Sequence, residues 1–377
     1  MTPGQVLNGE RLVDLRDLVG LSQAALAERL GVNQATVSLV ERGERTFPDS
    51  LATAAAAAFD LPESFFAVPS ALVDAAPVTF RKKSSASVRD EKRIIKKHRE
   101  AARLFEECSR RAAYHTSRLP HLEDHDGDTL LAAEAVRAAA GLGAEEPIPN
   151  VVRLIERLGV GVISHLESGD ATDADHVSIS RPADAGGRPL VALVASCPGD
   201  MARLSLAHEI GHLIFDRQRA KPIKSTRSPE EKRAYDFASA LLVPDTVMRR
   251  NISAALTLHG YLPIKARYGI SVAALIVRAH RMGLISDARA RSLHIQRSSQ
   301  GWNRSEPVAV KAEVPLLLEQ SYRQAFPGRS NASVAVELGM MPGLIDDWVD
   351  DRPAEAGKAP IVVSLDDWRR HKSSSQA

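Results

Sequence analysis

Cysteine is almost absent from this chain, with Cys108 and Cys197 the only two among 377 residues. They lie far apart in unrelated contexts, which excludes a disulfide framework and favours the reducing environment of the cytoplasm. Long apolar runs are also missing, since none approaches the roughly 20 residues that a membrane-spanning helix needs. The first residues lack the basic and apolar regions of a secretory signal peptide. We therefore expect a cytoplasmic protein without a membrane segment.

The composition is that of an ordinary globular protein, with 44% hydrophobic and 25% charged residues. It excludes a largely disordered or fibrous chain, and the length allows two or three domains. The pattern predicts a mainly α-helical chain with a small β-sheet, an α+β fold. Changes in composition predict four segments: a domain of five helices at 1–66, a basic helical linker at 67–145, an α+β domain at 146–285, and a helical C-terminal region at 286–377 with a disordered tail.

Hydrophobic spacing and turn residues place the main elements of secondary structure. We expect helices at residues 89–117, 151–158, 201–215 and 229–242. Three short β-like runs, at 160–164, 177–180 and 190–195, predict the sheet. The C-terminal region offers no constellation of ligand residues, so we assign it no chemistry beyond regulation of the central domain or assembly.

The N-terminal segment carries two short helices in close succession. Ser22 is placed to cap the first, Gly31 supplies the left-handed turn that ends it, and Asn33 can cap the second. Two helices joined so tightly cross steeply, which pushes the start of the second outward, where it can enter a DNA major groove. Gln34 is able to bond adenine there, and Ser38 lies one turn further along the same face.

Residues 21–43 read LSQAALAERLGVNQATVSLVERG. Over residues 10–66 the chain resembles the lambda-repressor-like, or XRE-family, helix-turn-helix regulators. The resemblance implies double-stranded operator DNA as a partner and a structural pair between Glu41 and Arg16. A homodimer would multiply the contacts by reading two half-sites. The DNA-contacting residues expected from the motif are Gln23, Asn33, Gln34, Thr36 and Ser38, with Gln23 on the phosphate backbone.

An alternative for this segment is a helical module that dimerises and no longer binds DNA. Residues 1–63 hold five Arg and nine Asp or Glu, and a domain of that charge attracts DNA phosphates poorly. Residues 81–99 hold nine Lys or Arg and two acids, so this segment could compensate by lying along adjacent phosphates. A solvated face without a ligand explains its charge equally well.

Residues 208–212 read His-Glu-Ile-Gly-His. On a helix, side chains four residues apart share one face, so His208 and His212 can bind one metal ion. Glu209 sits beside that face, where it can accept a proton from water. A zinc site needs a third protein ligand, and the apolar stripe of the next helix brings both Glu230 and Glu231 to its margins. The spacing does not choose between them, and two histidines on an ordinary helix remain the structural alternative.

The two helices together resemble the ImmA/IrrE family of metallopeptidases. The chain has HEIGH at 208–212 and EKRAYDFASALLVP at 231–244, where the family has H-E-x-G-H followed by E-x-x-A-x-x-F-A-x-x-L-L-x-P. The resemblance covers residues 150–285 and implies a zincin-like fold. It also implies zinc, or alternatively manganese, held by His208, His212 and Glu231, with Glu209 as the general base. One departure is Tyr235, which replaces the common Asn or Asp at a position that bears on how the histidines are oriented.

The leading hypothesis is a DNA-binding transcription regulator fused to a zinc endopeptidase that cleaves a repressor or an antitoxin-like protein. The second is a regulator whose metal domain senses a ligand or holds structure without proteolysis, and the third is an enzyme whose N-terminal module only dimerises.

Candidate oxyanion donors are His259, Tyr261 and His280, although packed or surface roles suit each better. The strand at 190–195 is a candidate edge to which an extended peptide could add.

Overall fold

The computed structural model describes residues 6–69, 79–82, 87–120, 127–167, 176–181, 188–217 and 228–350. The predicted disordered tail, 372–377, lies outside these residues. The helices are α1 (Glu10–Leu18), α2 (Gln23–Arg29), α3 (Gln34–Glu41), α4 (Asp49–Ala58), η1 (Glu63–Ala67), α5 (Val88–Arg111), α6 (Thr129–Ala139), α7 (Val151–Arg157), α8 (Gly199–Phe215), α9 (Pro229–Leu242), α10 (Asp245–Asn251), η5 (Leu258–Tyr261), α11 (Leu262–Tyr268), α12 (Val272–Arg281), α13 (Asp287–Ser299), α14 (Leu317–Ala325), α15 (Asn331–Leu338) and α16 (Pro342–Val349). The strands are β1 (Thr79–Lys82), β2 (Gly161–Ile163), β3 (His176–Arg181) and β4 (Leu190–Leu193).

The predicted α+β fold, mainly helical with a small sheet, is confirmed. The helices expected at 151–158, 201–215 and 229–242 correspond to α7, α8 and α9, and the three predicted strands correspond to β2, β3 and β4. Within the described ranges, no helix is both long enough and apolar enough to cross a membrane.

The four strands form one sheet in the order β1-β3-β4-β2. β4 lies inside it, antiparallel to β3 and parallel to β2. The prediction that a peptide adds to the strand at 190–195 is therefore wrong, because the backbone of β4 is already paired on both sides. β1, in the segment expected to be a helical linker, pairs antiparallel with β3, with Thr79 opposite Ser180. Because its partner β3 lies far along the chain, no local sequence pattern predicts β1.

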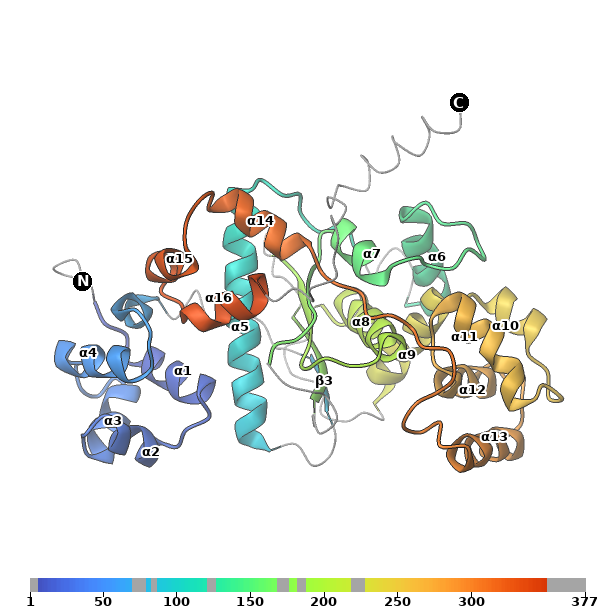
Figure 1. The fold of residues 1–377 in the computed structure, drawn as a ribbon, viewed down its shortest axis with the longest axis horizontal. Coiled ribbons are helices and arrows are strands. Elements are labelled where there is room, and N and C mark those ends of the chain that lie inside the picture. Colours follow the sequence, from blue (N-terminus) through green and yellow to red (C-terminus); the bar gives the residue numbers. More distant parts are fainter. Residues whose placement is uncertain are drawn as a thin grey trace.

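The sheet separates two hydrophobic cores. Successive side chains of β4 point to opposite faces, so Val191 and Leu193 join one core while Leu190 and Ala192 join the other. The first core contains the helices from α6 to α13, and the second contains α5 and the helices from α14 to α16. Figure 1 shows α5 on one side of the sheet and α8 with α9 on the other. Burial on both faces explains why β2 and β4 are continuous apolar runs.

α5 is the long central helix, and it packs against α1, α14 and β4. The helix expected at 89–117 ends earlier, at Arg111. It ends there because Ala113 adopts a left-handed φ of 52° and the following chain turns toward α7. The Tyr114 hydroxyl then donates to the carbonyl oxygen of Glu156 at 3.0 Å. No glycine or proline marks this end of the helix, and the contact of Tyr114 holds the chain in its new direction.

The N-terminal domain has the five expected helices, of which the fifth, η1, is a short 3-10 helix. It is fastened to α5 through Arg11, whose side chain is fully buried. The guanidinium lies 2.7 Å from a carboxylate oxygen of Glu100 and 2.9 Å from one of Asp14. Lys96 of α5 also pairs with Asp14. Burial opposes ionisation of Glu100, but Arg103 and Arg11 outweigh it and lower the pKa of this carboxyl group, so the junction stays charged.

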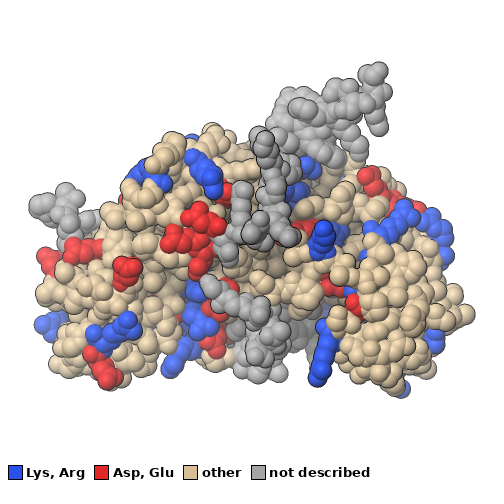
Figure 2. Space-filling model, viewed as in Figure 1, with Lys and Arg blue, Asp and Glu red and all other residues tan. Residues whose placement is uncertain are grey.

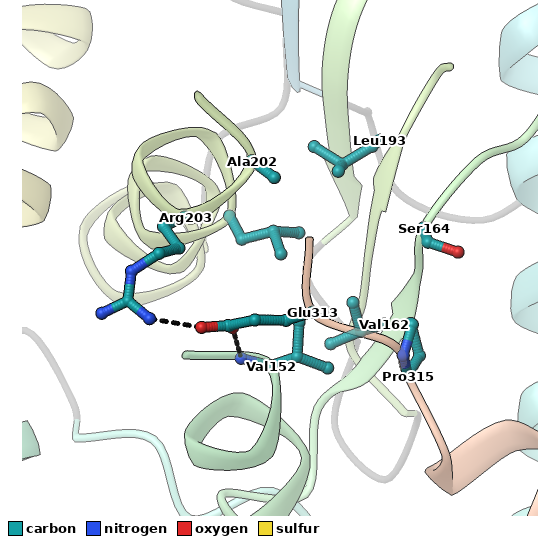
Figure 3. A pocket seen from close by; sticks show the side chains of 9 residues that line it. Val152, Val162, Ser164, Leu193, Ala202, Arg203, Glu313 and Pro315 are labelled. Carbon is teal, nitrogen blue, oxygen red and sulfur yellow. Dashed lines mark hydrogen bonds and ion pairs between the residues drawn. The ribbon is translucent and has the colours of Figure 1, made fainter. Parts of the chain in front are cut away.

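A segment without helix or strand, residues 300–316, runs from α13 to α14 across the helices of the first core (Figure 1). Glu313 on this segment accepts from the backbone N–H of Val152 at 2.9 Å, in the first turn of α7. Its other carboxylate oxygen pairs with Arg203 of α8, beside a cavity of about 10 Å³ that has room for roughly one water molecule (Figure 3). The C-terminal region therefore fixes α8 relative to α7.

Candidate metal centre and nucleic-acid interface

α8 carries the H-E-x-x-H motif inside the protein. His208, Glu209 and His212 are each at most 3% exposed. Gly211 allows the close approach of a neighbouring element, and this element is α9. A Cβ atom at Gly211 would lie 3.0 Å from the Cα of Ala234. The histidine-bearing part of α8 therefore lies directly against the beginning of α9.

α9 brings a carboxylate to the two histidines. Ser228 caps this helix by accepting from the backbone N–H of Glu231 at 3.2 Å, which fixes its first turn. The Nε2 atom of His208 is 3.3 Å from Oε2 of Glu231, and the Nε2 atom of His212 is 3.3 Å from Oε1. The two Nε2 atoms are 3.1 Å apart. Of the two adjacent glutamates that the spacing left open, Glu231 is the one that joins the histidine pair.

The three side chains fit a zinc ion. Tetrahedral zinc binds histidine nitrogen and carboxylate oxygen at about 2.0–2.2 Å, which places neighbouring ligand atoms roughly 3.3–3.5 Å apart. The separations here, 3.1 and 3.3 Å, are already close to that value. Two histidines and one glutamate are also a donor set that catalytic zinc sites use, and it leaves the fourth position for water or substrate.

Asp216 orients one of the two histidines. Its Oδ2 lies 2.8 Å from Nδ1 of His212, so that Nε2 faces Glu231, and its Oδ1 accepts from Arg233 of α9 at 2.6 Å. A carboxylate behind a metal-binding histidine fixes the ring and makes it a better ligand. The buried Nδ1 of His208 has no hydrogen-bond partner within the described ranges. The two histidines are therefore supported unequally.

The charges of the cluster depend on one another. Burial disfavours the charged imidazolium of His212, but hydrogen bonds with Asp216 and Glu231 outweigh burial and raise its pKa to about 10. Burial likewise opposes ionisation of Glu231, but His208 and His212 lower its pKa to about 2. In the absence of metal the cluster therefore holds a proton on His212 at neutral pH, in the place that a cation would take.

A hydrogen bond from the sheet holds the side chain of Glu209 in place. The hydroxyl of Ser178 on β3 donates to Oε1 of Glu209 at 2.6 Å, and both side chains are buried. β3 therefore fixes the direction of the carboxylate that follows His208 in the motif. A positioned carboxylate beside a candidate metal centre is the arrangement that general-base chemistry needs.

In the N-terminal domain, local hydrogen bonds set the angle between α2 and α3. Ser22 accepts from the backbone N–H of Ala25 at 3.2 Å, and Asn33 accepts from that of Thr36 at 2.8 Å, as the caps require. Gly31, between the two helices, has the left-handed φ of 66°. Gln34 then begins α3 with an exposed side chain. The geometry thus presents the start of α3 to an external partner.

Several predicted DNA-contacting side chains are bonded within the domain. Asn33 is exposed but accepts from the hydroxyl of Thr36 at 2.9 Å in addition to capping α3. Ser38 is half-buried and accepts from Arg42 at 3.0 Å. Gln23 donates to Glu41 at 2.6 Å, next to the expected pair between Glu41 and Arg16.

Comparison with known families agrees with both motifs. Residues 12–66 match the family model described as helix-turn-helix, and residues 155–280 match that of the IrrE N-terminal-like domain, a peptidase family. The chain joins a helix-turn-helix domain to an IrrE N-terminal-like domain. Both resemblances drawn from the motifs are confirmed, and the chain combines a DNA-binding regulator module with a peptidase-like domain. No curated protein matches the chain.

Two residues that support the metal centre of the IrrE-like domain were not predicted from the sequence. Asp216 had a usable signal, because it follows His212 by the same four residues that separate His212 from His208. Ser178 had none, because it precedes Glu209 by 31 residues and lies on a different element. Only the packing of β3 against α8 makes them neighbours.

Tyr235 of the IrrE-like domain is engaged with α12. Its hydroxyl donates to the carbonyl oxygen of Ala274 at 3.2 Å, and the guanidinium of Arg281 lies over its ring. The departure from the family pattern at this position therefore ties α9 to α12. Asp216 at the end of α8 supplies the carboxylate that orients His212.

The candidate oxyanion donors have structural contacts elsewhere. His259 packs edge-on against Trp302, with ring centroids 5.2 Å apart, and His280 pairs with Asp287. Tyr261 is fully buried in the core of the IrrE-like domain. These are the packed and surface roles that the sequence favoured for the three residues.

Proposed function

We propose that this protein is a DNA-binding transcription regulator whose IrrE-like domain is a zinc-dependent endopeptidase that cleaves a repressor or an antitoxin-like protein. The observation that carries the proposal is the convergence of His208, His212 and Glu231 at zinc-ligand spacing, with Glu209 beside them. The peptidase family match of the domain supports the same chemistry.

In this mechanism each residue of the centre has a separate task. His208, His212 and Glu231 hold the metal, and Asp216 keeps the ring of His212 in place. When bound, zinc supplies Lewis acidity to the scissile carbonyl and makes a water molecule more acidic. Glu209, aimed by Ser178, takes a proton from the attacking water and returns it to the leaving amine.

The DNA half of the proposal rests on α3. The exposed Gln34 reads a base edge in the major groove, with Asn33, Thr36 and Ser38 along the same helix and Gln23 at the phosphate backbone. To reach the backbone, Gln23 exchanges its bond with Glu41 for one with a phosphate. A homodimer would place two such helices on successive half-sites.

Metal content tests the centre before any substrate is known. We expect wild-type protein to hold about one equivalent of zinc by elemental analysis, and His212→Ala to hold none. Glu231→Gln and Glu230→Gln form a matched pair of adjacent carboxylates, and only the first should lose zinc. Manganese in place of zinc would change the metal but not the site, whereas zinc retained by Glu231→Gln would refute the ligand set.

Proteolysis is tested with zinc-loaded protein and candidate repressors. Glu209→Gln should keep its zinc and lose cleavage, because it removes the proton acceptor and leaves the ligands in place. A cut that persists in this variant would contradict the mechanism.

The second candidate function is a metal domain that senses or stabilises without proteolysis. The near-complete burial of the three motif residues favours it, because a substrate needs access to them. In that case Glu209→Gln would keep both zinc and regulation of the target promoter.

Base reading is tested by selecting preferred duplexes from a random pool. Gln34→Ala should lose discrimination by roughly 1–3 kcal/mol, the range for one bidentate base contact. Gln300→Ala, an exposed glutamine at the end of α13, is the matched control and should keep the wild-type preference.

A further inference from the structure

The helix-turn-helix domain has few arginines free to meet DNA. Of its five arginines, Arg11 is buried, while Arg16 pairs with Glu41 and Arg42 with Glu44. Contacts to phosphate normally supply much of the affinity of a DNA-binding protein. Positive charge for contacts to phosphate must therefore come largely from outside the domain.

α5 brings positive charge to the domain. α1 and α5 lie side by side in opposite directions. Contacts advance along α1 as they go back along α5: Arg11 with Glu100, then Asp14 with Lys96, then the turn at Gly20 with Arg93. A Cβ atom at Gly20 would lie 3.5 Å from Nη1 of Arg93. The first turns of α5 therefore lie beside the turn between α1 and α2.

Two basic residues on these turns are exposed. Lys92 precedes Lys96 by four residues and Arg89 precedes it by seven, so both lie on the face of α5 that meets the domain. Within the described ranges neither forms an ion pair. The neighbouring Asp90 is bonded to Arg93 at 3.0 Å, so its charge is already partly compensated.

The position of these residues suits a DNA backbone. Figure 1 shows the start of α5 at the same end of the molecule as α2 and α3. Figure 2 shows Lys and Arg side chains along that lower edge, where α5 begins. The buried pair of Arg11 with Glu100 and the half-buried pair of Lys96 with Asp14 fix α5 against the domain, so little freedom is lost when the charges meet phosphates.

We propose that Arg89 and Lys92 form a second DNA-backbone contact, on the phosphates that flank the half-site read by α3. The inference rests on the proposed DNA binding and adds a surface that lies outside the residues matching the helix-turn-helix family. It assigns the charge of α5 to duplex DNA, and it explains how an acidic reading domain binds a polyanion.

The test is the salt dependence of DNA binding by the full chain. Binding to a labelled duplex of about 30 base pairs of mixed sequence is followed by fluorescence anisotropy between about 50 and 200 mM salt. The double variant Arg89→Gln and Lys92→Gln should flatten the slope of log K against log salt by about two. At about 100 mM salt its affinity should fall at least tenfold.

Arg110→Gln is the matched control, because it removes an exposed arginine from the other end of the same helix, roughly 30 Å away. It should keep the wild-type slope. A double variant that also keeps the wild-type slope overturns the second contact and leaves DNA binding by α3 intact. A wild-type protein without salt-dependent binding overturns the proposed DNA binding itself, and this inference with it.

Discussion

The helix-turn-helix domain and the metal centre place their functional side chains by opposite means. In the domain, Gln34 is exposed, and caps a few residues away determine where it points. In the centre, His212 and Glu231 are buried on two helices, and each depends on the other for its charge. Exposed reading groups should therefore be replaceable with little loss of stability. Buried chemical groups should not.

The largest effect is expected where the domain departs from this rule. Arg11 belongs to the helix-turn-helix domain but is buried among Glu100, Asp14 and the ring of Phe65. Arg11→Met should lower the free energy of unfolding by about 3 kcal/mol, because it leaves buried carboxylates with fewer partners. Urea denaturation measures it, and the exposed Arg29→Met is the control, expected near wild type. A wild-type midpoint for Arg11→Met would mean that the junction contributes no stability.

The second-largest effect is the pH dependence of zinc binding, which only the buried centre should show. Because His212 has its pKa raised to about 10, the metal-free centre is protonated below that pH, and zinc must displace the proton. Zinc affinity should therefore rise with pH, by up to about tenfold per unit and roughly a hundredfold from pH 6 to 8. Competition with a chelator of known affinity measures the trend, and calorimetry in two buffers counts the protons released. A zinc affinity that does not change with pH would show that His212 holds no proton in the metal-free centre.

A smaller effect is expected one step away from the ligands. Asp216→Asn keeps the shape of the side chain but removes the charge behind His212. Zinc should bind about 10–100-fold more weakly, the usual result of losing such a partner. Asp287→Asn, which alters the partner of the surface His280, is the matched control. Equal zinc affinity in the two variants would contradict the orienting role.

The smallest effect concerns a single cap in the reading domain. Asn33→Ala removes the acceptor for the backbone N–H of Thr36 and should cost about 1 kcal/mol of stability. Asn33→Asp keeps a side-chain acceptor and should therefore have the stability of the wild-type protein. Thermal unfolding measures both variants. A loss as large as that of Arg11→Met would erase the difference between the two regions.

Much of the fold could be predicted because its signals are local. Ser22, Gly31 and Asn33 act on the backbone within one turn, so α2 and α3 begin where the caps indicate. β1 could not be predicted, because its stability depends on pairing with β3 far along the chain. For the same reason the sequence could not show that β4 is an inner strand, whose backbone has no free edge for a peptide.

The sequence by itself determined the helix-turn-helix, the histidine pair and the neighbouring glutamates, because helical geometry alone brings residues four apart onto one face. Only the tertiary structure decided that Glu231 joins the histidines, that Ser178 holds Glu209, and that α5 lies against the reading domain. These juxtapositions depend on which elements pack together. Packing is determined by the whole core, and no short stretch of sequence contains that information.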